Sequence, residues 1–249
     1  MTRTPSALAT ENYLKAIVKA LAEPGRERLS TGELARLLGV TAGTATSMVK
    51  KLEKDGYVSN EARQGCILTK AGRAYGLRIL RRHRLLESFL VGVLHMDWAD
   101  VHEEAENLEH AVSERLVDAI DAFMGNPRRD PHGDPIPSKI QRVYAVRDTP
   151  LSALDEGIDV TIVRVAGDRT ALEYFRREGL VPGAEVRVIS RQRDAGLATL
   201  SVAGREAIFA MSTLGRVFFE APHAERASGH ADGDGARNAV QGDGAGGGV

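Results

Sequence analysis

Four side chains of the kinds that bind metal ions recur within one short stretch of this chain. They are His102, Glu106, Glu109 and His110. At about 100° per residue, a helix places all four on one stripe beside an apolar stripe. Two carboxylates three residues apart repel each other, so a cation is expected between them. A divalent metal ion accepts this set of nitrogen and oxygen ligands. A solvated acidic face with incidental histidines is the alternative.

A second pair of possible ligands, His83 and Glu87, lies four residues apart and therefore on one helix face. An ordinary hydrogen bond between the two explains this spacing equally well. The segment His102–Glu106 resembles the H-E-x-x-H signature of zinc proteases, but it lacks the second histidine. The sequence shows no nucleophile–base pair and no Gly-rich phosphate loop. We therefore expect no enzyme, and a metallohydrolase stays as a further alternative.

Cysteine usage and hydropathy indicate the cellular compartment of the protein. Cys66 is the only cysteine among 249 residues, which excludes an intrachain disulfide and a multi-cysteine metal site and indicates a reducing compartment. The longest apolar run, residues 89–94, is too short for a membrane span, and the N-terminus lacks the apolar core of a signal peptide. We expect a cytoplasmic protein without a membrane partner.

The first third of the chain has the pattern of a winged helix-turn-helix. Thr10 is suited to cap the first helix, and Ser30 and Glu33 form a capping box before the second. Glycine separates the second and third helices, as in a helix-turn-helix. The expected elements are helices over 10–21, 33–38 and 41–55 and a hairpin over 56–59 and 66–69.

Charge supports DNA binding by this unit. Residues 1–94 carry 16 Lys and Arg against 8 Asp and Glu, whereas residues 95–135 carry 3 against 11. A basic segment followed by an acidic one fits a nucleic-acid surface beside a cation site. The third helix would enter the major groove of double-stranded DNA. A unit used only for protein contacts is the alternative. The expected contacts are Thr41, Gly43, Thr44, Thr46, Ser47, Lys50, Lys51 and, at the hairpin tip, Arg63.

The rest of the chain predicts two further folded units. Apolar stripes indicate long helices over 69–94 and 99–124, which suit dimerisation on a two-fold operator. Short alternating strands then fit a small SH3-like barrel with one helix over 170–178. The fold class is mainly α with a small β domain. The predicted units are a winged helix-turn-helix over 1–72, a helical metal-binding and dimerisation domain over 73–140, an SH3-like domain over 151–221 and a disordered tail over 222–249.

Several motifs in order resemble the diphtheria-toxin-repressor family of metal-dependent transcriptional repressors, and more closely its manganese-regulator branch. The resemblance covers roughly residues 8–220. It rests on Thr10-Glu-Asn-Tyr-Leu, Lys54-Asp-Gly, Arg82-His-Arg-Leu-Leu-Glu87, Val101-His-Glu-Glu-Ala-Glu-Asn-Leu-Glu-His110, Gly133-Asp-Pro-Ile-Pro137 and Gly179-Leu-Val-Pro-Gly183. None of these motifs is specific alone, whereas their order and spacing together are.

The resemblance implies two metal sites. The primary site would join Asn12 of the first helix to Glu106, Glu109 and His110. The ancillary site would use His83, Glu87 and His102, with Asp168 as a possible further ligand, while Ala171 at the neighbouring family position cannot ligate. Two-metal members have a carboxylate where this chain has Lys15, so two separated sites are expected rather than a dinuclear cluster.

The predicted function is a homodimeric, metal-dependent regulator that binds palindromic operator DNA and represses metal-uptake genes. Glu106 stands where iron-type members tend to have a cysteine, and a carboxylate there favours Mn²⁺ over Fe²⁺. Co²⁺, Ni²⁺ or Zn²⁺ can substitute in vitro. Without metal, Glu106 and Glu109 are expected to repel and leave the first helix free to swing. A winged-helix regulator that responds to a small organic effector is the alternative.

Overall fold

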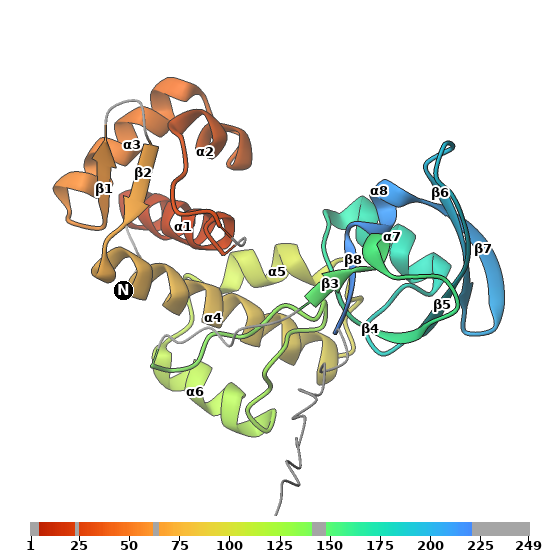
Figure 1. Ribbon diagram of the computed structural model, residues 1–249. Helices are drawn as coiled ribbons and strands as arrows, with labels where there is room; N and C mark the ends of the chain where they lie inside the picture. The colour runs from red at the N-terminus through yellow and green to blue at the C-terminus, as the bar shows by residue number, and fades with distance from the viewer. Residues whose placement is uncertain (1–4, 23–24, 62–64, 141–147, 221–249) are drawn as a thin grey trace, which may run out of the picture.

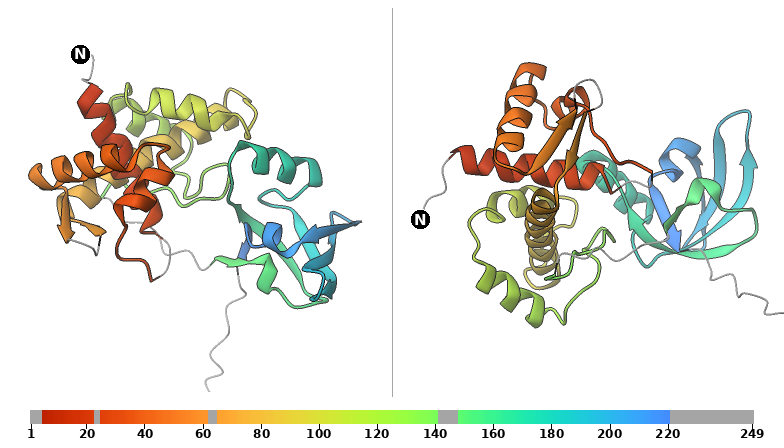
Figure 2. Two further views of the ribbon diagram at one scale, coloured as in Figure 1. Left: turned by 90° about the horizontal axis from the view of Figure 1, so that it is seen from above. Right: turned by 60° about the vertical axis from the view of Figure 1, so that its left-hand side comes forward.

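The computed structural model describes residues 5–22, 25–61, 65–140 and 148–220. Within them, a winged unit and a β-rich unit flank a central helical unit (Figures 1 and 2). This confirms the predicted fold class. No described helix is both long and apolar enough to cross a membrane. Arg63 and the predicted tail lie outside the described residues.

The winged unit packs three helices against a hairpin. Its elements are α1 (Pro5–Ala20), α2 (Thr31–Leu37), α3 (Ala42–Lys54), β1 (Val58–Glu61) and β2 (Gly65–Leu68). The capping box of Ser30 and Glu33 is present, and Thr41 caps α3. Thr10 does not cap α1, because the helix begins at Pro5 and the Thr10 hydroxyl donates to the Ser6 carbonyl inside it.

Helix α4 (Lys70–Gly92) is the axis of the molecule, and α1 crosses it closely. A Cβ atom at Gly76 would lie 2.7 Å from the Leu14 carbonyl oxygen, so only glycine allows this crossing. The expected single helix over 99–124 is instead α5 (Val101–Leu108) and α6 (Glu114–Phe123). A new helix begins after Ser113, whose hydroxyl accepts from the Leu116 amide and caps α6.

The β-rich unit is one antiparallel sheet with strand order β3-β8-β4-β5-β6-β7. Irregular pairing in β4 and β5 bends the sheet around an apolar core, as expected for a small barrel. The strands are β3 (Asp148–Pro150), β4 (Asp159–Val165), β5 (Glu185–Gln192), β6 (Leu197–Val202), β7 (Arg205–Ala210) and β8 (Val217–Glu220), with a 3₁₀ turn (Leu151–Ala153), α7 (Arg169–Glu178) and α8 (Met211–Leu214).

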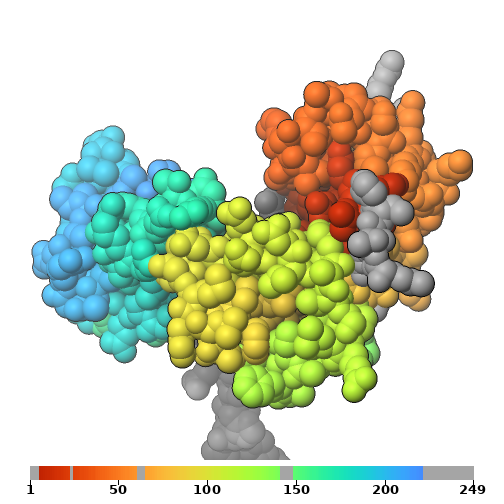
Figure 3. Space-filling view, turned by 180° about the vertical axis from the view of Figure 1, so that it is seen from behind, coloured from red at the N-terminus to blue at the C-terminus, as the bar shows by residue number. Residues whose placement is uncertain are grey.

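The β-rich unit is docked on the segment before α5. Ala99 is 2% exposed and belongs to the core of the β-rich unit, with Trp98 packed against it. Arg176 and Arg169 of α7 form ion pairs with Asp97 and Asp100. The space-filling view shows the two units in direct contact (Figure 3). The central helical unit therefore has one interface with the winged unit and another with the β-rich unit. We call them the first and the second joint.

Candidate metal centre

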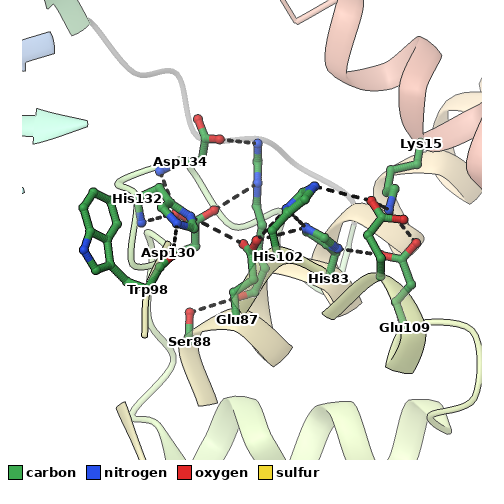
Figure 4. Close-up of polar contacts among 12 residues, drawn as sticks. Lys15, His83, Glu87, Ser88, Trp98, His102, Glu109, Asp130, His132 and Asp134 are labelled. Atoms are coloured by element: carbon green, nitrogen blue, oxygen red, sulfur yellow. Dashed lines mark hydrogen bonds and ion pairs between the residues drawn. The ribbon is translucent and has the colours of Figure 1, made fainter. Parts of the chain in front are cut away.

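Four of the predicted metal ligands gather where α4 and α5 meet, beside Lys15 of α1 (Figure 4). They are His83, Glu87, His102 and Glu109. Glu109 is fully buried at the end of α5, and its Oε2 lies 2.7 Å from Nδ1 of His83 on α4. Its Oε1 lies 3.3 Å from Nε2 of His110. Nδ1 of His110 in turn lies 2.6 Å from Oε2 of Glu11 on α1. Three helices distant in sequence thus contribute to one cluster of carboxylates and imidazoles.

Asn12, the predicted first-helix ligand, is the residue after Glu11. Its Oδ1 is buried and accepts no hydrogen bond from the described residues. A buried polar atom without a partner is costly unless a ligand satisfies it. The neighbouring Glu11 contacts His110, so α1 meets the residues at the end of α5 here. An orphaned amide oxygen, carboxylates and an imidazole together make a donor set that fits a divalent cation.

Lys15 is the residue whose contacts the sequence prediction missed. Its ammonium lies 2.6 Å from Oε1 of Glu106 and 2.6 Å from Oε1 of Glu109. The expectation that these two carboxylates repel freely without metal is therefore wrong, because a lysine from α1 bridges them. The spacing of Lys15 one turn after Glu11 was visible in the sequence, but the pairing across 91 residues was not.

The three predicted ancillary ligands do come together. Nε2 of His83 lies 3.0 Å from Nδ1 of His102 and 3.0 Å from Oε1 of Glu87. His102 also reaches Glu106, at 3.6 Å, so His83, His102 and Glu106 can hold one ion. His83 contacts Glu109 as well, and the primary and ancillary sets therefore adjoin each other rather than standing apart.

A third group of possible ligands was not predicted. Glu87, Asp130 and His132 are buried, and their ligand atoms lie within 4.8 Å of one another. They line a cleft of about 490 Å³ between α4, α5 and the β-rich unit, and Asp168 lines the same cleft. Asp168 also caps α7, since its Oδ1 accepts from the Ala171 amide. The sequence signal for this group is the Asp130-Pro-His132 run, which lies in the loop after α6.

Charge in these clusters is tuned by burial and by neighbours. Burial disfavours the charged imidazole of His83, but the carboxylates of Glu87 and Glu109 outweigh it and raise the pKa of His83. Burial works against ionised Glu106, but Lys15 prevails and lowers the pKa of that carboxyl. Burial and the nearby Glu87 raise the pKa of Asp130 well above its ordinary value. Metal binding at His83 would release a proton.

The predicted DNA contacts lie on one face of α3. Thr46, Ser47 and Lys50 are exposed, as are the residues at the start of the helix. Thr41 uses its hydroxyl to cap the helix, and a Cβ at Gly43 would meet only that hydroxyl, at 3.8 Å. Lys51 differs from the rest of this surface, because its ammonium donates to Thr10 of α1 and pairs with Asp55.

Comparison with known families covers almost the whole described chain. Residues 8–66 match the model of the iron-dependent repressor N-terminal DNA-binding domain. Residues 69–138 match the iron-dependent repressor metal-binding and dimerisation domain, and residues 149–220 match the FeoA domain. These three matches confirm the predicted resemblance and its order of units.

Individual relatives agree. The iron-dependent repressor IdeR of Mycobacterium tuberculosis is 31% identical over 79% of this chain and 90% of its own length. The HTH-type transcriptional regulator MntR of Bacillus pumilus is 37% identical over 47% of this chain and 77% of its own. A manganese-dependent transcriptional repressor solved with manganese has 37% identity and a TM-score of 0.78, covering 86% of this chain and all of its own. The chain belongs to the diphtheria-toxin-repressor family of metal-dependent transcriptional repressors.

Proposed function

We propose that Mn²⁺ is the corepressor and that Asn12, Glu106, Glu109 and His110 bind it. The observation that carries this proposal is the orphaned, buried Oδ1 of Asn12, one residue from the Glu11 that contacts His110, in a proposed donor set that contains no sulfur. Hard oxygen ligands favour Mn²⁺, and Fe²⁺ is the second candidate. We do not propose Cys66 as a ligand, because it is buried in the core of the winged unit and its thiol donates to the Leu29 carbonyl.

The proposed mechanism links the metal site to DNA through α1. A bound divalent cation supplies positive charge that α1 and α5 can share. Asn12 then ties α1 to α5, and α1 holds α3 through Lys51 and Thr10. The tie fixes the orientation of the winged unit in the state that binds DNA, so metal and DNA strengthen each other's binding.

A homodimer would place two such winged units on a palindromic operator. Large apolar side chains of α5 and α6 are exposed in the single chain, with Leu116 49% and Phe123 71% exposed. Burying them against a second copy is favourable. We propose that the two copies bind successive major grooves of uptake-gene operators in the cytoplasm.

The cleft group of Glu87, Asp130 and His132, with Asp168 at its wall, would hold a second ion. These residues come from α4, the loop after α6 and the β-rich unit, so an ion there would fasten the β-rich unit to the helical one. We assign both clusters to metal sensing. The family membership leaves the organic-effector and metallohydrolase alternatives without support.

The test is DNA binding at fixed ionic strength, with Mn²⁺ or anaerobic Fe²⁺ titrated into the native chain and into Glu106→Ala. We expect Mn²⁺ to tighten DNA binding at a lower free concentration than Fe²⁺, and we expect Glu106→Ala to lose the response. Glu104→Ala is the matched control, because Glu104 is an exposed carboxylate on the same helix. Equal DNA affinity with and without metal in every protein would overturn the proposal and reopen the organic-effector alternative.

A further inference from the structure

Lys15 occupies a place that a metal ion would need. The residue is 5% exposed, and its ammonium lies between two of the four proposed ligands. The pair with Glu109 is buried, because the Glu109 side chain is fully buried, and the pair with Glu106 is partly buried, with the Glu106 side chain 37% exposed. Figure 4 shows the lysine reaching from α1 into the carboxylates of α5.

Glu109 has little capacity left for a further cation. Its Oε1 is 2.6 Å from the Lys15 ammonium, and its Oε2 is 2.7 Å from His83. Divalent ions bind carboxylate oxygens at roughly 2.0–2.6 Å. An ion on Oε1 would therefore stand close to the ammonium, and two positive charges at such a distance in a buried site repel strongly.

The same contact replaces part of what metal would do. Lys15 neutralises two carboxylates and joins α1 to α5, which is the tie that we assign to the bound ion. Removing one partner of a buried ion pair leaves an uncompensated charge, and an incoming cation relieves that cost. The metal-free state is thus stabilised relative to the metal-bound one by a charge that the chain itself carries.

We propose that Lys15 is an internal cation that competes with the metal ion for Glu106 and Glu109 and so sets the metal concentration at which the protein responds. This inference rests on the proposed function of the same site. It assigns Lys15 a role in setting the metal affinity without making it a ligand. The ammonium must move off at least one carboxylate before the ion is fully coordinated.

The test is calorimetric titration of Mn²⁺ into the full chain at fixed pH and ionic strength. Lys15→Gln removes the charge but keeps a hydrogen-bond donor, and we expect it to bind Mn²⁺ tighter by on the order of tenfold or more. Lys15→Arg keeps the charge on the same oxygens, and its affinity should stay at or below the native value. Lys54→Gln, at an exposed lysine at the end of α3, is the control and should change the affinity far less.

Thermal unfolding of each metal-free variant establishes that it is folded. If Lys15→Gln is unfolded, Lys15→Arg carries the test, since tighter binding by that variant would overturn the inference. An unchanged or weaker affinity of folded Lys15→Gln would overturn the inference while leaving the proposed function intact. If the native chain binds no Mn²⁺ but Lys15→Gln does, the inference stands and the proposed function fails. If neither binds, both fail.

Discussion

The two joints of the molecule use the same kinds of side chain in different electrostatic settings. At the joint between the winged and helical units, Lys15 places a positive charge among the carboxylates of α5. At the joint between the helical and β-rich units, Asp130 lies beside Glu87, and Arg84 approaches it only to 3.4 Å. At the first joint the Lys15 ammonium lies 2.6 Å from each of two carboxylates, whereas at the second joint burial beside Glu87 raises the pKa of Asp130. The loss of a metal ion should therefore affect DNA binding to a different extent at each joint.

The largest expected effect comes from Glu109→Gln. This change removes a carboxylate that faces Lys15 and His83 at once, so we expect metal-dependent DNA binding to weaken by on the order of 100-fold. Gel retardation with and without Mn²⁺ at constant salt measures it. A response that survives this substitution would show that the first joint does not control DNA binding.

A smaller effect is expected at the second joint from Asp130→Asn. The asparagine oxygen can still accept from the His132 and Asp134 amides, so the loop should keep its shape while the cluster loses one charged ligand. We expect one fewer Mn²⁺ per chain by equilibrium dialysis and roughly fivefold weaker DNA binding, a typical coupling between distinct sites.

Asp194→Asn, at an exposed aspartate between β5 and β6, is the control for that experiment and should leave the metal count unchanged. A loss of DNA binding as large as that of Glu109→Gln would erase the distinction between the two joints.

The smallest effect is expected from Arg176→Gln, which removes the ion pair with Asp97 at the edge of the second joint. The Arg176 side chain is 49% exposed, so its pair is screened by solvent and should contribute at most about 0.5 kcal/mol. Denaturant unfolding should barely change. A drop of several kcal/mol would mean that α7, rather than the packing of Trp98 and Ala99, holds the β-rich unit.

Local patterns predicted the ligands, and long-range pairing decided what surrounds them. The stripe of His102, Glu106 and Glu109 was visible because α5 keeps helical spacing through this stretch. The spacing ends after Leu108, and Ser113 was a recognisable cap that an unbroken apolar stripe concealed. Thr10 failed as a cap because the five residues in front of it are also helical.

The missed residues depend on the path of the chain in space. Lys15 contacts Glu109 across 94 residues, and the local sequence around either residue does not predict this pairing. Asp130 and His132 lie in a loop whose composition indicates only a turn. They come close enough to Glu87 to form a candidate metal site because the loop folds back over α4. Periodicity predicts which side of a helix is polar, but not which distant charge will face it.

One carboxylate contributes to two neighbouring groups. Glu109 offers one oxygen to Lys15 and its other oxygen to His83, which also contacts Glu87. A rotation of this carboxylate toward either neighbour changes its geometry with the other. A metal ion bound in the first cluster would therefore alter the affinity of the second, and by thermodynamic reciprocity each would alter the other's affinity by the same factor. Two clusters that share a carboxylate would not respond to metal as independent sites do.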